Sequence, residues 1–238
     1  MKNGIIKLLL GLFIILIILG VEAYGQNSDA QENGTRTIYL IRHGEYTPQD
    51  DNIPDSENVL TPLGIAQARL VSARLKSMNV KFSSLTSSTM TRARQTAMVI
   101  NEDFPDLNLE ESDLIRECTP PTWRNDVMAG VNTVHRMECV ENLEKAFNKF
   151  FIPSTDENDR NDIIVCHGNV IRYFVTKVLK VNTMSWLQMT ISNCSLTVVR
   201  IKPDGTMKLV SFNDVGHIPP NLQTETGGNN KSKELIIR

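Results

Sequence analysis

The stretch IYLIRHGEY, residues 38–46, decides our interpretation of the fold. Its first four residues are large and apolar without polar alternation, a pattern typical of a strand that is covered on both faces of a sheet. The run stops abruptly at RHG, residues 42–44. A second apolar run, IIVC at residues 163–166, also stops at His-Gly. Ligands of α/β proteins bind at the carboxyl ends of the strands, so both histidines are expected at the same functional rim.

The rest of the pattern alternates between strands and helices. Thr61-Pro62 is a typical helix start, with a capping threonine followed by proline in the first turn. Apolar spacing predicts helices over residues 62–78, 91–103, 136–151 and 170–180, and strands over 37–42, 80–87, 162–166, 195–201 and 207–212. We therefore predict an α/β fold, a three-layer sandwich whose sheet is mostly parallel with an antiparallel edge hairpin.

Composition limits the classes of function. The chain has 238 residues, of which 41% are hydrophobic and 22% charged, so it can form one large domain with tails. A net charge of −2 and 6% aromatic residues argue against nucleic-acid binding. The cysteines form no CxxC pair and have no zinc-type spacing, so we predict four free thiols, at Cys118, Cys139, Cys166 and Cys194.

The two ends of the chain are expected to lie outside the domain. Residues 8–21 are apolar and uncharged and follow two lysines, which fits either a signal peptide or a membrane anchor within residues 1–24. Both interpretations stay open. Residues 25–36 are polar and predict a linker. A domain over 37–220 would then be followed by a disordered tail over 221–238.

Three further positions carry chemistry at the expected rim. Arg92 lies near the start of a predicted helix, where backbone N–H groups also attract an anion, whereas Arg94 should point away as an ordinary surface charge. Glu117, in LIREC, is either a common loop carboxylate or a proton donor with a raised pKa. Arg42 is either part of a basic surface turn or a phosphate ligand. Each signal alone is weak.

Together the segments are specific. LIRHGEY, SSTMTRARQTA, LIREC and IVCHGNVIRY, in this order, resemble the histidine phosphatase superfamily, also called phosphoglycerate-mutase-like, over residues 37–220. LTPLGIAQARL and DVGHIPP, among others, are most similar to phosphoglycerate mutase family member five, a branch of membrane-anchored mitochondrial Ser/Thr protein phosphatases. The tryptophan-rich assembly segment that this branch often carries is missing, because the only tryptophans are Trp123 and Trp186. Assembly by that route is therefore in doubt, and a homodimer stays open.

The resemblance implies a mechanism and its residues. His43 would be the nucleophile that takes up the phosphoryl group, and Glu117 would protonate the leaving oxygen and then deprotonate water. It implies no metal ion and no other cofactor. The side chains implied to hold the transferring group are Arg42, Arg92, His167 and Asn169.

Alternatives remain at the level of substrate and location. The substrate is a phosphorylated protein or a small phosphate ester, and the non-enzymatic alternative is a membrane-tethered scaffold with an inactive pocket. The location is a mitochondrial membrane or, after signal-peptide cleavage, the outside of the cell or the periplasm. We expect residues 47–60 and 119–135 to form the pocket walls. Structural or surface roles are expected for His135, His217 and Arg172.

Overall fold

The structure is a computed structural model that describes residues 34–46 and 53–225. Its strands are β1 (Arg36–Arg42), β2 (Ser84–Ser88), β3 (Leu109–Ser112), β4 (Arg160–Cys166), β5 (Leu196–Ile201) and β6 (Met207–Asp214). Its α-helices are α2 (Pro62–Lys76), α3 (Thr91–Asp103), α4 (Asn125–Met128), α5 (Thr133–Phe150) and α6 (Gly168–Val178). Short 3-10 helices are η1 (Asp55–Glu57), η2 (Asp113–Ile115), η3 (Thr183–Gln188) and η4 (Pro220–Leu222).

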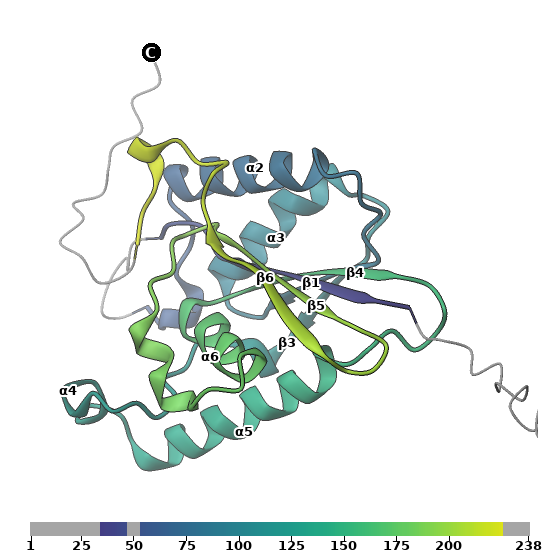
Figure 1. Ribbon diagram of the computed structural model, residues 1–238. Helices are drawn as coiled ribbons and strands as arrows, with labels where there is room; N and C mark the ends of the chain where they lie inside the picture. Colours follow the sequence, from purple (N-terminus) through teal and green to yellow (C-terminus); the bar gives the residue numbers. More distant parts are fainter. Residues whose placement is uncertain (1–33, 47–52, 226–238) are drawn as a thin grey trace, which may run out of the picture. The chain divides into compact units, whose positions relative to one another are not determined.

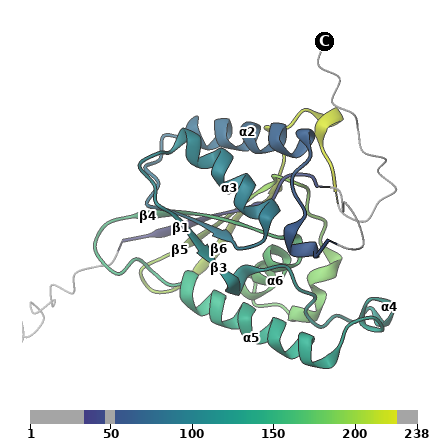
Figure 2. The same cartoon turned by 180° about the vertical axis from the view of Figure 1, so that it is seen from behind.

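The strands form one mixed sheet in the order β3-β2-β4-β1-β5-β6 (Figure 1). The first four of these strands are parallel to one another, and β5 and β6 are antiparallel. Helices α2 and α3 cover one face of the sheet, and α5 and α6 cover the other (Figures 1 and 2). The predicted three-layer α/β fold with an antiparallel edge hairpin is therefore confirmed.

Burial on both faces explains the uninterrupted apolar strands. Ile38 and Leu40 belong to a core cluster that contains residues of α5 and α6, whereas Tyr39 and Ile41 belong to a cluster with residues of α2 and α3. Successive side chains of a strand point to opposite faces, so a strand between two helical layers must be apolar at every position. Helix α2 begins as predicted, because the Thr61 side chain accepts a hydrogen bond from the Gly64 N–H.

The main differences from the predicted elements lie at short or polar segments. Strand β3 was not predicted, because it has only four residues and Glu110 and Glu111 are exposed. Helix α5 begins at Thr133, three residues before the predicted start, because the Asn132 side chain accepts a hydrogen bond from the Val134 N–H. Such a cap gives a start signal that an apolar pattern does not contain.

The prediction of four free thiols is wrong for two of the cysteines. Cys118 and Cys139 form a disulfide, and their Cα atoms are 5.7 Å apart. They are separated by 21 residues, so the pairing depends on how the segment after η2 packs against α5, which the spacing does not reveal. Cys166 and Cys194 are free, as predicted, and both are buried in the core.

The domain extends beyond the boundary expected at residue 220. Thr224 is buried, accepts a hydrogen bond from the Gln67 side chain and donates one to Asn193. Residues 221–225 are therefore part of the fold rather than of a disordered tail. The expected anchor or signal peptide, the linker up to residue 33 and the tail from 226 lie outside the described residues. Among the helices in the part of the chain described, none is long and apolar enough to cross a membrane.

Gly44 has a packing reason that the sequence analysis did not give. The neighbour of Gly44 is the backbone of α2. A Cβ at Gly44 would lie 2.4 Å from the Gly64 carbonyl oxygen, and one at Gly64 would lie 2.0 Å from the Glu45 carbonyl oxygen. The pair of glycines lets the end of β1 and the start of α2 touch.

Candidate active site

The sheet brings the predicted phosphate-handling residues to one rim. Arg42 ends β1 and pairs with Cys166, so His43 and His167 follow on adjacent parallel strands. Arg92 is the second residue of α3. All four side chains are buried, with exposed fractions of 3% or less, at Arg42, His43, Arg92 and His167. Four polar side chains in a desolvated cluster need partners or a ligand, because unpaired burial is costly.

The orientation of the His43 ring is fixed by its neighbours. Its Nδ1 lies 2.8 Å from the Gly44 carbonyl oxygen, which can only accept, so Nδ1 carries the proton. The lone pair is then on Nε2, which lies 3.3 Å from the Arg92 Nε. The arrangement leaves a basic nitrogen facing a guanidinium, at a point where an anion would be attracted.

The second histidine lies next to the first. The ring centroids of His43 and His167 are 5.1 Å apart. His167 Nε2 is 2.8 Å from the Ser88 Oγ, and its Nδ1 is buried without a hydrogen-bond partner among the described residues. A buried nitrogen of this kind has the capacity to bond a bound group.

Both imidazoles are held neutral. Burial lowers the pKa of His43 well below its usual value, and the charges of Arg42 and Arg92 lower it further. Burial and the same two arginines lower the pKa of His167 in the same way. A neutral imidazole is the nucleophilic form, so both rings are in the protonation state that a nucleophile requires at neutral pH.

The two guanidiniums approach the rim from opposite sides. Arg42 donates to the Ile191 carbonyl oxygen at 2.7 Å, and burial lowers the pKa of Arg42 only to about 10, so it stays charged. Arg92 donates to the carbonyl oxygen of Asp55 at 2.7 Å and to its carboxylate at 3.1 Å, and it stacks over Tyr46 at 4.4 Å. Asp55 thus bonds the guanidinium on which a phosphate would depend.

Glu117 is a buried carboxyl group with a raised pKa. Burial raises the pKa of Glu117 to about 7, against the opposing charges of Arg42, Arg92 and Arg172. Its Oε1 is buried and has no partner within the part of the chain that the structure describes. A carboxyl with such a pKa exchanges its proton readily near neutral pH, as a general acid and base must do.

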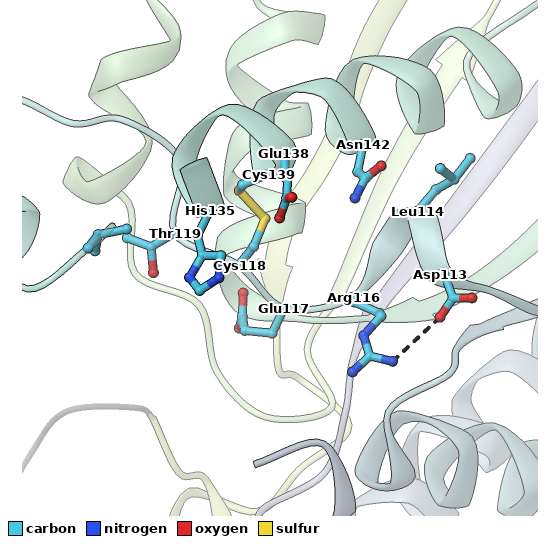
Figure 3. Close-up of a pocket in the computed structure, with 11 residues that line it drawn as sticks. Asp113, Leu114, Arg116, Glu117, Cys118, Thr119, His135, Glu138, Cys139 and Asn142 are labelled. Carbon is cyan, nitrogen blue, oxygen red and sulfur yellow. Dashed lines mark hydrogen bonds and ion pairs between the residues drawn. A yellow bond between two sulfur atoms is a disulfide. The ribbon is translucent and has the colours of Figure 1, made fainter. Parts of the chain in front are cut away.

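A groove of about 570 Å³ borders Glu117 (Figure 3). One wall is the segment from Asp113 to Thr119, and the other is α5, from which His135, Glu138 and Asn142 project. The disulfide closes the groove between these walls. The expectation for residues 119–135 is supported at Thr119, Val131 and His135, which line the groove. Residues 47–52 lie outside the described part.

The remaining predictions have mixed outcomes. Arg94 is exposed and forms an ion pair with Glu111, as expected of a surface charge. His135 is exposed, and the Nε2 of His217 bonds the Cys194 carbonyl oxygen at 2.9 Å, a structural contact. Asn169 does reach the rim, but its amide donates to the Cys118 carbonyl oxygen at 2.9 Å rather than being turned to an open site.

Sequence reasoning missed Asp55 and Ser88. Ser88 ends β2, which pairs with the buried strand β4, so its position at a carboxyl end could have suggested a contact with His167. Asp55 lies within residues 47–60, an expected pocket wall, but nothing in its polar stretch, DDNIPDSEN, singles it out. Within residues 34–46 and 53–225, no group of three or more His, Cys, Asp and Glu side chains is arranged to hold a metal ion.

Comparison with known proteins agrees with this geometry. The profile of the histidine phosphatase superfamily (branch 1) matches residues 38–215. The chain belongs to this superfamily. It is a phosphatase, and its motif residues occur in the order that the sequence analysis described.

Two curated relatives match most of this chain and about two thirds of their own length. The mitochondrial serine/threonine-protein phosphatase Pgam5 of Caenorhabditis elegans is 38% identical over 204 residues, which cover 81% of this chain and 68% of that protein. Its human counterpart is 33% identical over 201 residues, which cover 81% of this chain and 67% of that protein. A phosphoglycerate mutase structure from Plasmodium falciparum has a TM-score of 0.56 and 28% identity, over 79% of this chain and 96% of that one.

Proposed function

We propose that this phosphatase removes phosphate from serine and threonine side chains of proteins through a phosphohistidine at His43. The observation that carries the proposal is the orientation of that ring. Its Nδ1 proton is held by the Gly44 carbonyl oxygen, and its Nε2 lone pair faces Arg92 beside the second histidine. A fixed tautomer of this kind prepares one nitrogen as nucleophile, as in other histidine-dependent sites.

In the first half-reaction, His43 Nε2 attacks phosphorus while the bond from phosphorus to the ester oxygen breaks. Glu117 gives its proton to the departing oxygen, so a neutral alcohol leaves and Glu117 becomes a carboxylate. The charge on the three transferring oxygens is stabilised by Arg42 and Arg92 and by a hydrogen bond from His167. The raised pKa of Glu117 supports this role, because a proton must be present to be given.

In the second half-reaction, water attacks phosphorus and the phosphorus–nitrogen bond breaks. The Glu117 carboxylate takes a proton from this water, which returns the acid to its starting form. His43 regains its lone pair, and inorganic phosphate leaves. Asp55 bonds Arg92 in the structure, so bound phosphate has to share this guanidinium with Asp55 or displace it.

Two observations favour a protein substrate over a small phosphate ester. The curated relatives that match most of this chain carry the name serine/threonine-protein phosphatase. Glu117 also borders a groove of about 570 Å³, a volume in the range of sites that take ligands larger than a single small ester.

We also propose a mitochondrial location, with residues 1–24 as a membrane tether. The names of the relatives include the word mitochondrial, and residues 8–21 are apolar and uncharged. Fractionation of cells followed by carbonate extraction tests both parts: the protein should remain in the mitochondrial membrane pellet. Release into the supernatant would contradict the tether, and recovery outside mitochondria would contradict the location.

The substrate class is tested by comparing phosphothreonine peptides with phosphorylated metabolites. The purified protein should release phosphate from the peptides with a kcat/KM at least ~10-fold higher than from small sugar or glycerate phosphates. The His43→Ala variant should release none from either. A preference for the small esters would move the assignment to the metabolite class, and activity that survives in His43→Ala would overturn the mechanism.

A further inference from the structure

The segment that carries Glu117 lacks regular structure. We call residues 117–121 the acid loop; they lie between η2 and α4, and the structure assigns them to no helix or strand. Pro120 and Pro121 have no backbone N–H, so the loop cannot complete a ladder of backbone hydrogen bonds. Its carbonyl groups need other partners when they are buried.

Asn169, in the first turn of α6, supplies one such partner. Its Nδ2 donates to the Cys118 carbonyl oxygen at 2.9 Å, and its Oδ1 accepts from the Arg172 Nη2 at 2.6 Å. A guanidinium only donates, so Arg172 determines which end of the amide is oxygen. The amide nitrogen of Asn169 is thereby directed at the carbonyl group of Cys118, the residue that follows Glu117.

Trp186, in η3, holds the other end of the loop. Its ring is 1% exposed, and its Nε1 lies 3.0 Å from the Pro121 carbonyl oxygen and 3.2 Å from that of Pro120. Arg172 joins the two anchors, since its guanidinium lies 4.8 Å from the Trp186 ring centroid and also donates to the Met189 carbonyl oxygen at 3.1 Å. The three side chains are therefore one connected unit.

We infer that Asn169, Arg172 and Trp186 clamp the acid loop and position Glu117 for proton transfer to the leaving alcohol. This inference rests on the proposed function. None of the three is a catalytic residue, because Asn169 and Trp186 bond the loop backbone and Arg172 holds these two side chains in place. Misplacement of a catalytic group by about 1 Å can cost on the order of 100-fold in rate. A loop that lost these anchors, although still joined to α5 by its disulfide at Cys118, would therefore support the acid less precisely.

The clamp predicts losses that depend on the leaving group. A nitrophenolate ion leaves without help, whereas the alkoxide of threonine needs a proton, and general acid catalysis supplies roughly 10²–10⁴-fold for such steps. In kcat/KM, which reports the steps up to release of the alcohol and not the later attack of water, Asn169→Ala and Trp186→Phe, which keeps an aromatic ring, should therefore lose at least ~10-fold on a phosphothreonine peptide. On p-nitrophenyl phosphate the loss should stay below about 3-fold.

The comparison also separates the clamp from a phosphate-binding role of Asn169. A side chain that bonds the transferring phosphoryl group contributes to both substrates, because that group is common to them. Equal losses of Asn169→Ala on the peptide and on p-nitrophenyl phosphate would therefore overturn the inference. Unchanged rates on both substrates would overturn it as well.

Arg172 allows geometry and charge to be separated. Groups that face Glu117 are Arg42 from β1, Arg92 from α3 and Arg172 from α6, while His135 and Glu138 of α5 line the groove that it borders. Arg172→Lys keeps the positive charge but loses the planar guanidinium that bonds both Asn169 and Met189. It should therefore show the loss that depends on the leaving group, while the alkaline limb of its pH–rate profile stays close to that of wild type. Arg172→Met also removes a charge that favours the carboxylate, so its alkaline limb should move to higher pH. The same limb in both variants would contradict the place of Arg172.

The control is Asn101→Ala. Asn101 Nδ2 also bonds backbone carbonyl groups, of Phe104 and Leu107, each at 2.9 Å, but it does so at the end of α3. It should lower both rates equally or not at all.

Glu117→Gln should show the selective loss in kcat/KM more strongly than the clamp variants do. If it does and the clamp variants do not, only the clamp is wrong; if wild type hydrolyses neither substrate, the proposed function has failed.

Discussion

At the residue scale, the Glu117 carboxyl serves catalysis at a cost in stability. Its pKa of about 7 lies above the ordinary 4.5 because burial disfavours the charged form. A group whose pKa is raised in the folded state stabilises the fold below its unfolded pKa, and this contribution is lost as pH rises through the folded pKa. The cost therefore develops between pH 4.5 and about 7, in the range where the acid must work.

Replacing this carboxyl should make the protein more stable and less active. At pH 8, Glu117→Gln should raise the free energy of unfolding by about 2–3 kcal/mol, because the amide has no charge to bury. The gain should shrink as pH is lowered and vanish near pH 4.5. Urea unfolding of both proteins across this range measures the difference. A variant that is no more stable than wild type at pH 8 would show that the carboxyl is not desolvated.

The same residue predicts the pH dependence of hydrolysis. Glu117 must be protonated to assist the leaving alcohol, so kcat/KM for a phosphothreonine peptide should fall as pH rises through about 7. In Glu117→Gln this alkaline limb should disappear together with most of the activity. Rate profiles for both proteins from about pH 5.5 to about pH 9 make the comparison. If the alkaline limb persists in the variant, its cause is the titration of another group.

At the element scale, the junction of β1 and α2 depends on two glycines. Gly44→Ala would place a Cβ 2.4 Å from the Gly64 carbonyl oxygen, which belongs to backbone and cannot rotate away. Overpacking of this kind costs about 1–3 kcal/mol, and here it also displaces the residue next to His43. Chemical denaturation should show this loss, whereas Gly130→Ala, with open space around its Cβ, should change stability little. Equal stability of both variants would contradict the close approach.

The elements were largely predictable because their causes are local. The unbroken apolar runs of β1 and β4 require cover on both faces, and Thr61-Pro62 starts α2 by its own chemistry. The site residues could be found because strand ends at one rim bring His43 and His167 together.

What the sequence analysis missed depends on distant contacts. The disulfide exists because the acid loop packs on α5, Asp55 meets Arg92 across 37 residues, and the Asn169 amide faces a carbonyl 51 residues away. No residue pattern encodes such pairings. They follow only after the layers have assembled.

At the scale of the whole molecule, the disulfide joins the two walls of the groove, the acid loop and α5 (Figure 3). Cross-linking residues 21 apart stabilises the fold by about 3 kcal/mol when the unfolded chain is constrained. The double variant Cys118→Ser, Cys139→Ser should lose about this amount in urea unfolding. A dithiol reductant should lower the stability of wild type by a similar amount and leave the double variant unchanged. Wild type that does not respond to the reductant would contradict the cross-link.

The central claim is that one imidazole carries the phosphoryl group. Rapid acid-free quenching of the enzyme with a ³²P-labelled phosphopeptide, followed by digestion and mass spectrometry, tests it most directly. We predict an acid-labile, base-stable label on His43 in wild type and none in His43→Ala, with more label in Glu117→Gln on an aryl phosphate because water attack is slowed. Label on a serine, a cysteine or His167, or turnover without any labelled intermediate, would contradict the account.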